Sequence, residues 1–457
     1  MNADLIDEAV LRRRAQSIVE AARRAGADSA DALAVQGVSL SASILNGEVE
    51  QATQNEAVDI GLRVFVGRRS AIVSTTSLDT RDYDRLVERA VAMAKLAPEN
   101  PFAGISETPD RPFGGDLDLA DTETAVDSDM LAARARAAEK AALAVDGVTR
   151  AGGAAASWSA SGVALATSAG FVGSHSGTRH GLSVTAIAGD GSALERDYDW
   201  TAARHFADLD DPETVGRRAG ERTTMRAGAR KLASMQAPVI FDQRVASSLI
   251  GHLLGAINGA AIARKSSFLA ERMGETVAAA AIDIADDPFV PRGPGSRPFD
   301  GVGMSAGAIK LVDNGVLASW LLDLASAREL ASARELDLTT NGRAARGTGG
   351  HPSPSPSNVI VRQGTESPAA LMRRAGRGLL VTQLMGRGAN IINGDYSRGA
   401  GGFWFEDGEI AYPVNEITIA GNLADMLMAL EPANDADPRE RVVCPTLAAG
   451  EMTIAGA

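Results

Sequence analysis

In the first part of the chain, two patterns of apolar residues follow one another: the spacing of an amphipathic helix, and then the alternation of apolar and polar residues that is typical of strands. Residues 5–25 place apolar side chains, among them Leu11, Ile18 and Val19, at the three- and four-residue intervals of an amphipathic helix. A second helix with the same spacing is predicted at residues 83–96. Between these helices, apolar and polar residues alternate and glycines punctuate the runs. This pattern predicts short antiparallel strands at residues 32–38, 39–47, 58–67 and 70–77.

The next part of the chain repeats this order of helix and strands. Prolines between residues 98 and 112 predict an extended connection. An alanine-rich helix is then predicted at residues 130–144, followed by alternating strand segments up to Trp200 and a helix at residues 212–231. The chain then passes into a second unit near residues 233–238, so we predict domains at 1–232 and 233–457.

The second half contains two clear hairpin signals. Asn314-Gly315 and Asp407-Gly408 each separate two apolar runs, and both dipeptides tolerate the positive φ angles of a tight turn. The proline-rich segment 347–357 cannot join a strand ladder easily, which predicts an exposed, mobile loop. Helices that alternate with antiparallel meanders predict an α+β protein of two domains, with a C-terminal domain rich in β-hairpins.

Composition limits the possible partners. The net charge is −13 and the pI is near 5.0, which disfavours direct binding to nucleic acid. A basic cluster at residues 217–231 fits the solvated face of a helix better than a DNA contact.

Cys444 is the single cysteine, no stretch is long and apolar enough to span a membrane, and the N-terminus lacks a signal-peptide core. We therefore expect a cytoplasmic protein with no membrane contact.

A predicted helix at residues 243–259 carries the first candidate for chemistry. Its apolar face includes Leu249, Ile250 and Leu253. Glycines at 251, 255 and 259 form a separate stripe, which predicts close approach of another backbone. His252 lies beside this stripe, on a helix without a second histidine.

A zinc protease helix needs two histidines on one face and a glutamate that activates water. If His252 were the first ligand, Leu253 would replace the glutamate and Ala256 or Ile257 the second ligand. If His252 were the second ligand, Ser247 or Ser248 would replace the first. Every register fails, so the helix is predicted to be a degenerate form of such a site.

Other polar residues give weaker signals. His175 and His180 share one predicted strand, but their odd spacing points them to opposite faces unless Gly177 makes a turn. The residues around Ser305 match the glycine–serine–glycine pattern of a nucleophile elbow, but the residues that follow predict a strand rather than the required helix.

Longer stretches of the sequence resemble a known family. The segments GHLLGAINGAAIARKSSFLAERMGE, GRGLLVTQLMGRGANIINGDYSRGAGGFWFEDGEIAYPVNEITIAGNL and EMTIAGA are similar to the TldD/PmbA family, also called modulator of DNA gyrase. ILNGEVEQATQNEAVDIGLRVFVGRRSAIVSTT and GTRHGLSVTAIAGDGSALERDYDW in the first half fit as well. The resemblance covers nearly the whole chain and is strongest to the PmbA/TldE branch.

The resemblance implies a cytosolic proteolytic complex of two kinds of subunit. TldD-type subunits carry a His-Glu-x-x-x-His helix and a distant cysteine that bind zinc, and they cleave unfolded peptides. The associated roles are maturation of a peptide antibiotic and turnover of antitoxins. The PmbA branch lacks the zinc motif, as this chain does, although Cys444 lies where the TldD branch keeps its cysteine.

We therefore expect a non-catalytic partner subunit, without a catalytic residue or cofactor of its own, that forms a heterodimer with a zinc-bearing TldD-type subunit. A homodimer is possible when the chain is alone. Two alternatives stay open: a metallopeptidase in its own right, with His252 and Cys444 as weak metal-ligand candidates, and a non-proteolytic regulatory or binding module. Candidates for contact with peptide in a cavity are His252, His351, Tyr396 and Arg398.

Overall fold

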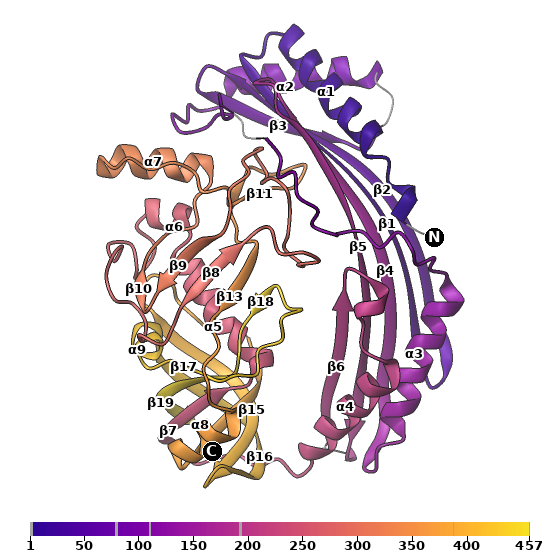
Figure 1. Ribbon diagram of the computed structural model, residues 1–457, viewed down its shortest axis with the longest axis vertical. Coiled ribbons are helices and arrows are strands. Elements are labelled where there is room, and N and C mark those ends of the chain that lie inside the picture. The colour runs from indigo at the N-terminus through magenta and orange to yellow at the C-terminus, as the bar shows by residue number, and fades with distance from the viewer. Residues whose placement is uncertain (1–2, 78–80, 109–110, 192–193, 387, 457) are drawn as a thin grey trace.

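The N-terminal half is built on one large antiparallel sheet. The computed structural model describes residues 3–77, 81–108, 111–191, 194–386 and 388–456. The strand order is β3-β2-β1-β4-β5-β6, so β6 forms one edge. Figure 1 shows the long strands curving around the C-terminal half. Their bounds are β1 Ser29–Leu45, β2 Glu48–Val66, β3 Arg69–Thr75, β4 Val148–Thr167, β5 Val172–Ala188 and β6 Glu195–Ala203.

Helices cover the convex face of this sheet (Figure 1). They are α1 Glu8–Arg24, α2 Arg81–Leu96, α3 Ser128–Leu143 and α4 Pro212–Met225. Alternate strand residues such as Leu40, Trp158 and Leu182 are buried in one apolar cluster with α3 and α4. A separate cluster joins the other end of the sheet to α1 and α2.

The opposite, concave face carries small side chains along the middle of β1 and β4. Residues between the buried positions of β1 and β4 pair across the sheet as Ser39 with Ser159 and Ser41 with Ser157. Ser183 of β5 and Ser157 are exposed. Because successive residues of a strand face opposite sides, this smooth polar surface faces away from the helices and toward the C-terminal half.

The C-terminal half contains a barrel-like sheet with the order β16-β15-β14-β7-β19-β17. An additional pairing of β16 with β19 closes it, and β7 pairs with β14 in the parallel sense. The bounds are β7 Met235–Phe241, β14 Arg377–Met385, β15 Asp395–Glu406, β16 Glu409–Asn422, β17 Glu431–Pro432 and β19 Leu447–Ala455.

A second sheet of this half has the order β10-β9-β8-β13-β18, and β11 pairs with β12. Its strands are β8 Ile284–Asp287, β9 Ile309–Asp313, β10 Val316–Leu317, β13 Asn358–Val361 and β18 Val442–Val443, with β11 Ala344–Ala345 and β12 Ser353–Pro354 beside them. The helices are α5 Gln243–Ala256, α6 Gly259–Ala263, α7 Leu324–Arg334, α8 Pro368–Ala375 and α9 Leu423–Met428. Leu249, Ile250 and Leu253 of α5 are buried with barrel residues such as Phe241 and Leu379.

The α+β class and both hairpin turns are confirmed. Asn314 and Asp407, with the glycine that follows each, have positive φ angles and join β9 to β10 and β15 to β16. Strand structure at residues 32–45 is confirmed, but its division into two short strands is wrong, because β1 runs through Gly37 without a turn. The helix predicted to Lys231 ends at Met225. No described helix is long and apolar enough to cross a bilayer.

The prediction of a freely exposed loop at 347–357 is also wrong in part. His351 is exposed, but Ser357 is fully buried and donates its hydroxyl hydrogen bond to Asp286 at 2.9 Å. Pro354 pairs with Ala344 in the β11–β12 ladder. The segment is therefore anchored at its C-terminal end, because a proline can occupy a short edge strand where its missing N–H is not needed.

Candidate functional site

Three neighbouring cavities follow β6 where it faces the C-terminal half. Their volumes are about 410, 450 and 600 Å³. The first and second share Trp200 and Arg439, and the second and third share Tyr198 and Arg244. We call this run of cavities the β6 groove. Its walls are β6 itself, the first two turns of α5, and the segments 290–294 and 437–444.

The side chains of β6 alternate between the groove and the helix layer. Arg196, Tyr198 and Trp200 are exposed, whereas Asp197 and Asp199 are buried between them. Asp199 forms an ion pair with Arg218 of α4, with 2.7 Å between the two charged groups. The alternation follows from the two-residue period of a strand, and it presents aromatic and cationic side chains together on one side.

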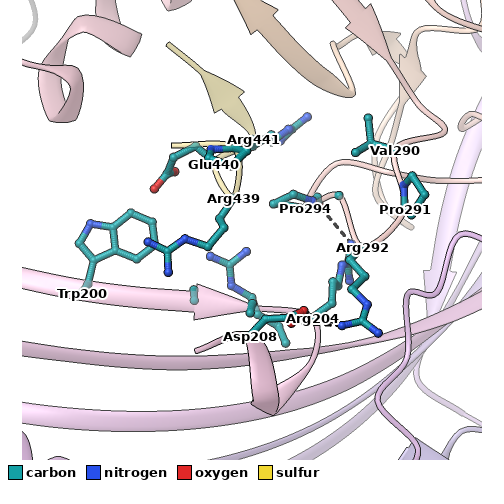
Figure 2. A pocket seen from close by; sticks show the side chains of 15 residues that line it. Trp200, Arg204, Asp208, Val290, Pro291, Arg292, Pro294, Arg439, Glu440 and Arg441 are labelled. Atoms are coloured by element: carbon teal, nitrogen blue, oxygen red, sulfur yellow. Dashed lines mark hydrogen bonds and ion pairs between the residues drawn. The ribbon is translucent and has the colours of Figure 1, made fainter. Parts of the chain in front are cut away.

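Arginines dominate the charge of the groove, with ten arginines and six acidic residues along its three cavities. Figure 2 shows Arg439 pointing toward Trp200 from one wall, with Arg204 and Arg292 on the opposite side of the cavity. Arg292 pairs with Asp118 at 2.6 Å and with Asp208 at 2.9 Å, which ties the two halves of the chain together. The groove is therefore a cationic site in an acidic protein.

Helix α5 presents its polar side to the groove. Gln243, Arg244, Ser247 and Ser248 line the second and third cavities, and Arg244 pairs with Asp197 of β6 at 3.1 Å. A hydroxyl group is a poor zinc ligand and cannot replace the glutamate that activates water. The side of α5 that lines the groove therefore offers amide, guanidinium and hydroxyl groups, and neither an imidazole nor a carboxylate.

The structure brings together three of the residues predicted to contact peptide. The rings of His252 and Tyr396 lie edge to face with centroids 5.9 Å apart. Burial and the nearby Arg398 guanidinium lower the pKa of His252. Burial raises the pKa of Tyr396 to about 12, against the opposing effect of Arg398. Arg398 itself lines the third cavity, while His351 lies elsewhere, near Arg63 and Arg346.

Cys444 lines the second cavity together with Ser247, but its side chain is buried. Burial and the charge of Asp435 raise the pKa of this thiol well above its usual range. The thiol donates a hydrogen bond to the carbonyl of Pro445 at 3.4 Å. A zinc ligand must be a thiolate, and within the described residues no three histidine, cysteine or acidic side chains gather in a possible metal cluster. These residues do not fit the zinc site of the TldD branch.

The glycine stripe does not act as predicted along α5. A Cβ atom on Gly251 would meet nothing within 4 Å, and on Gly255 it would meet only Ile391 at 3.9 Å. Gly259 begins α6 instead, and there a Cβ atom would lie 2.7 Å from the carbonyl oxygen of Leu321. Close backbone approach is therefore confined to the last glycine of the stripe.

The remaining candidates are separated by the fold. His175 and His180 lie on opposite faces of β5, since the strand has no turn at Gly177. His180 lies 3.3 Å from Asp121 on the helix side, whereas His175 contacts Phe299 on the concave side. The residues around Ser305 precede strand β9 and not a helix, so the nucleophile-elbow geometry is absent.

Sequence analysis missed the aromatic and cationic face of β6. The signal was present in the segment ERDYDWTAAR, where acidic residues alternate with tyrosine and tryptophan. An acidic residue at every second strand position predicts that the exposed face of the strand is the acidic one. Here Asp199 is buried against Arg218 and Arg222 of α4, and Asp197 is buried and paired with Arg244 of α5, which only the three-dimensional structure reveals.

Comparison with known proteins places the whole chain in one family. Models of the PmbA/TldA metallopeptidase match as domain 1 at residues 30–94, central domain at 121–227 and C-terminal domain at 234–456. Metalloprotease PmbA of Escherichia coli O157:H7 is 36% identical over 94% of this chain and 92% of its own length. A PmbA homologue of Haemophilus influenzae is 35% identical over 98% and 97%.

Solved structures share the fold. A Bacteroides thetaiotaomicron protein named as a candidate modulator of DNA gyrase superposes with a TM-score of 0.88 at 23% identity, covering 98% of this chain and 99% of its own. TldE from Thermococcus kodakarensis gives a TM-score of 0.82 at 21% identity, covering 96% and 99%. The Escherichia coli and Haemophilus influenzae relatives match along almost their full length, and the chain therefore belongs to the PmbA/TldD metallopeptidase family.

Proposed function

We propose that this chain is the non-catalytic partner subunit of a cytoplasmic TldD/PmbA-type zinc metallopeptidase that acts on unfolded peptides. The observation that carries the proposal is the polar side of α5. It presents Ser247, Ser248 and Arg244 to the groove, and neither a second imidazole nor a carboxylate base lies on the helix. Zinc belongs, in this proposal, to the TldD-type partner of a heterodimer.

The surroundings of His252 support the same proposal. The Arg398 guanidinium is close enough to lower the pKa of His252, and its positive charge would also repel a metal ion bound there. The middle strands of the concave sheet face carry serine and glycine residues, such as Ser157 and Gly181, and in this proposal they form a wall along which an extended chain passes. This chain would then shape the cavity in which the partner cleaves.

Co-purification with a TldD-type subunit tests the proposal. The pair should elute together, and zinc should be present at about one ion per pair and near zero in this chain alone. Peptide cleavage should require the partner and should increase when this chain is added. The variants H252A and C444S should leave the zinc content of the pair unchanged, as should the control H205A. Failure of the two chains to associate would contradict the proposal.

A second candidate function is metallopeptidase activity of this chain itself. Its weak ligand candidates are His252 and Cys444, of which Cys444 lines the second cavity. About one zinc per isolated chain, lost in C444S or H252A, would support this second function and contradict the first. The same zinc measurement therefore separates the two functions before any substrate is known.

A further inference from the structure

Strand β6 forms one edge of its sheet, and several of its backbone groups are already bonded to side chains: among them, the Arg196 carbonyl accepts from Gln383 at 3.3 Å, and the Tyr198 N–H donates to Asp197 at 2.8 Å. Within the described residues it pairs only with β5, from His180↔Ala203 to Ala188↔Glu195. An edge strand leaves backbone N–H and C=O groups on its outer side without a strand partner, and an extended peptide can bind there as an added strand. The second and third cavities of the β6 groove include residues from both faces of β6, so the groove extends past this edge.

The exposed side of β6 carries large aromatic groups. Tyr198 is 45% exposed and Trp200 is 38% exposed, whereas the other tryptophans, Trp158, Trp320 and Trp404, are at most 5% exposed. Two large rings at adjacent same-face positions of one strand form an exposed apolar surface. A ligand that covers this surface removes it from water, which favours binding. Ala202 follows at the next position and leaves space in the first cavity.

In the part of the chain that the structure describes, two arginines of the groove have no direct hydrogen-bond or ion-pair partner for their side chains. They are Arg179 of β5 and Arg196 of β6, and both line the groove. Arg439 and Arg292, by contrast, are paired with Asp437 and Asp208. The acidic residue near Arg179 is Glu440: burial and the charge of Asp437 raise its pKa, and the charges of Arg439 and Arg179 oppose this effect.

The spacing of these groups matches an extended ligand. Arg196, Tyr198, Trp200 and Arg204 are separated by even numbers of residues along β6 and its C-terminal extension. β6 ends at Ala203 and the chain bends at Arg204, so the extended part from Arg196 to Ala203 offers, at about 3.4 Å per residue, a pairing length of roughly eight residues for an added strand. The ends of this track are cationic and its centre is aromatic.

We infer that the β6 groove binds an unfolded peptide as an added β-strand, with a preference for peptides in which acidic residues flank aliphatic or aromatic ones. This inference rests on the proposed role in peptide handling and names its substrate class. The arginines would pair with acidic side chains of the peptide, Tyr198 and Trp200 would cover its apolar residues, and the β6 backbone would supply hydrogen bonds that do not depend on sequence.

Direct binding to the purified full-length chain tests the inference. The probes are three tryptophan-free decapeptides labelled with fluorescein: an alternating glutamate–valine peptide, its lysine–valine counterpart, and the glutamate peptide with alternate backbone amides N-methylated along the edge that would face β6. Anisotropy should give an affinity at least tenfold higher for the glutamate peptide than for either of the others. Added salt should reduce this preference.

Variants assign the binding to the groove. W200A should weaken binding of the glutamate peptide about tenfold or more, and R179S/R196S should remove most of the preference over the lysine peptide. The matched control R89S/R217S removes two arginines from exposed positions of α2 and α4 and should change neither value. Circular dichroism and thermal unfolding verify that each variant is folded.

Three results would overturn the inference. They are equal affinity for the glutamate and lysine peptides, unchanged affinity of the N-methylated peptide, and unchanged binding in W200A. Association with a TldD-type partner is measured separately. A chain that joins the partner but binds no peptide contradicts this inference alone, and one that binds peptide but joins no partner contradicts the proposed function alone.

Discussion

Burial keeps several histidines of this chain uncharged. Burial lowers the pKa of His175 to about 4, with Glu8 opposing and Arg204 and Arg297 assisting this effect. The ring of His175 contacts Phe299, which joins the concave sheet face to the C-terminal half. A histidine with a lowered pKa in the folded state binds a proton more readily after unfolding, so it links stability to pH.

We expect acid to destabilise the protein partly through His175. Between pH 6.5 and about 4 the unfolded state binds more protons than the folded state, so stability falls as the pH decreases and levels off below about 4. At pH 5 the loss relative to pH 8 should be about 2 kcal/mol from this residue. Urea unfolding of H175F, which keeps a ring beside Phe299, should show a correspondingly smaller loss. An identical pH dependence in both proteins would contradict the assignment.

Two glycines that belong to one sequence stripe have different roles in their elements. Gly251 lies inside α5 with open space where a Cβ atom would be, whereas Gly259 begins α6 against Leu321, Leu322 and Ser326. Substitutions at Gly251 report the intrinsic cost of glycine in a helix, whereas substitutions at Gly259 report the need for close packing at that position.

Substitution by alanine should therefore act in opposite directions at the two glycines. G251A should stabilise the chain by up to about 1 kcal/mol, because alanine has the higher helix propensity. G259A should destabilise it by roughly 1–3 kcal/mol, because the new methyl group would overlap the Leu321 carbonyl and its neighbours. Thermal and urea unfolding of the two single variants provide the measurement. Destabilisation by both would indicate that α5 is also closely packed at Gly251.

Elements with strong local signals could be predicted from the sequence, and those decided by distant contacts could not. The helix at α1 and the turns at Asn314 and Asp407 follow from local periodicity and turn chemistry. The length of β1 does not, since Gly37 reads as a break locally but is held in a ladder by β2 and β4. Strand pairing over such distances overrides a single glycine.

The candidate site was accessible from sequence only where it lies on a single element. The absence of a second histidine or glutamate on α5 is visible in the letters around His252. The groove is not, because it joins β6, α5 and the segment 437–444 from distant parts of the chain. Which side of β6 is exposed depends on Arg218 and Arg222, which bury Asp199.

The two halves of the molecule are joined by buried charges as well as by apolar contacts. Asp31 of β1 accepts a hydrogen bond from Arg63 at 3.1 Å and pairs with Arg346, which precedes the proline-rich segment. Burial lowers the pKa of Arg346 against the attraction of Asp31, which raises it. The backbone of Thr348 packs directly on Gly61 of β2. This segment therefore docks the C-terminal half onto the concave sheet.

Removal of the buried charge at Arg346 should weaken the whole molecule. R346M should lower the free energy of unfolding by about 3 kcal/mol, because breaking a buried ion pair leaves Asp31 with Arg63 alone to balance it. R374M removes an arginine that pairs with Glu366 and Glu431 on the surface, and it should cost less than about 1 kcal/mol. Urea unfolding followed by circular dichroism measures both. Equal, small effects would mean that apolar packing such as Leu33 against Phe299 holds the halves together without the buried pair.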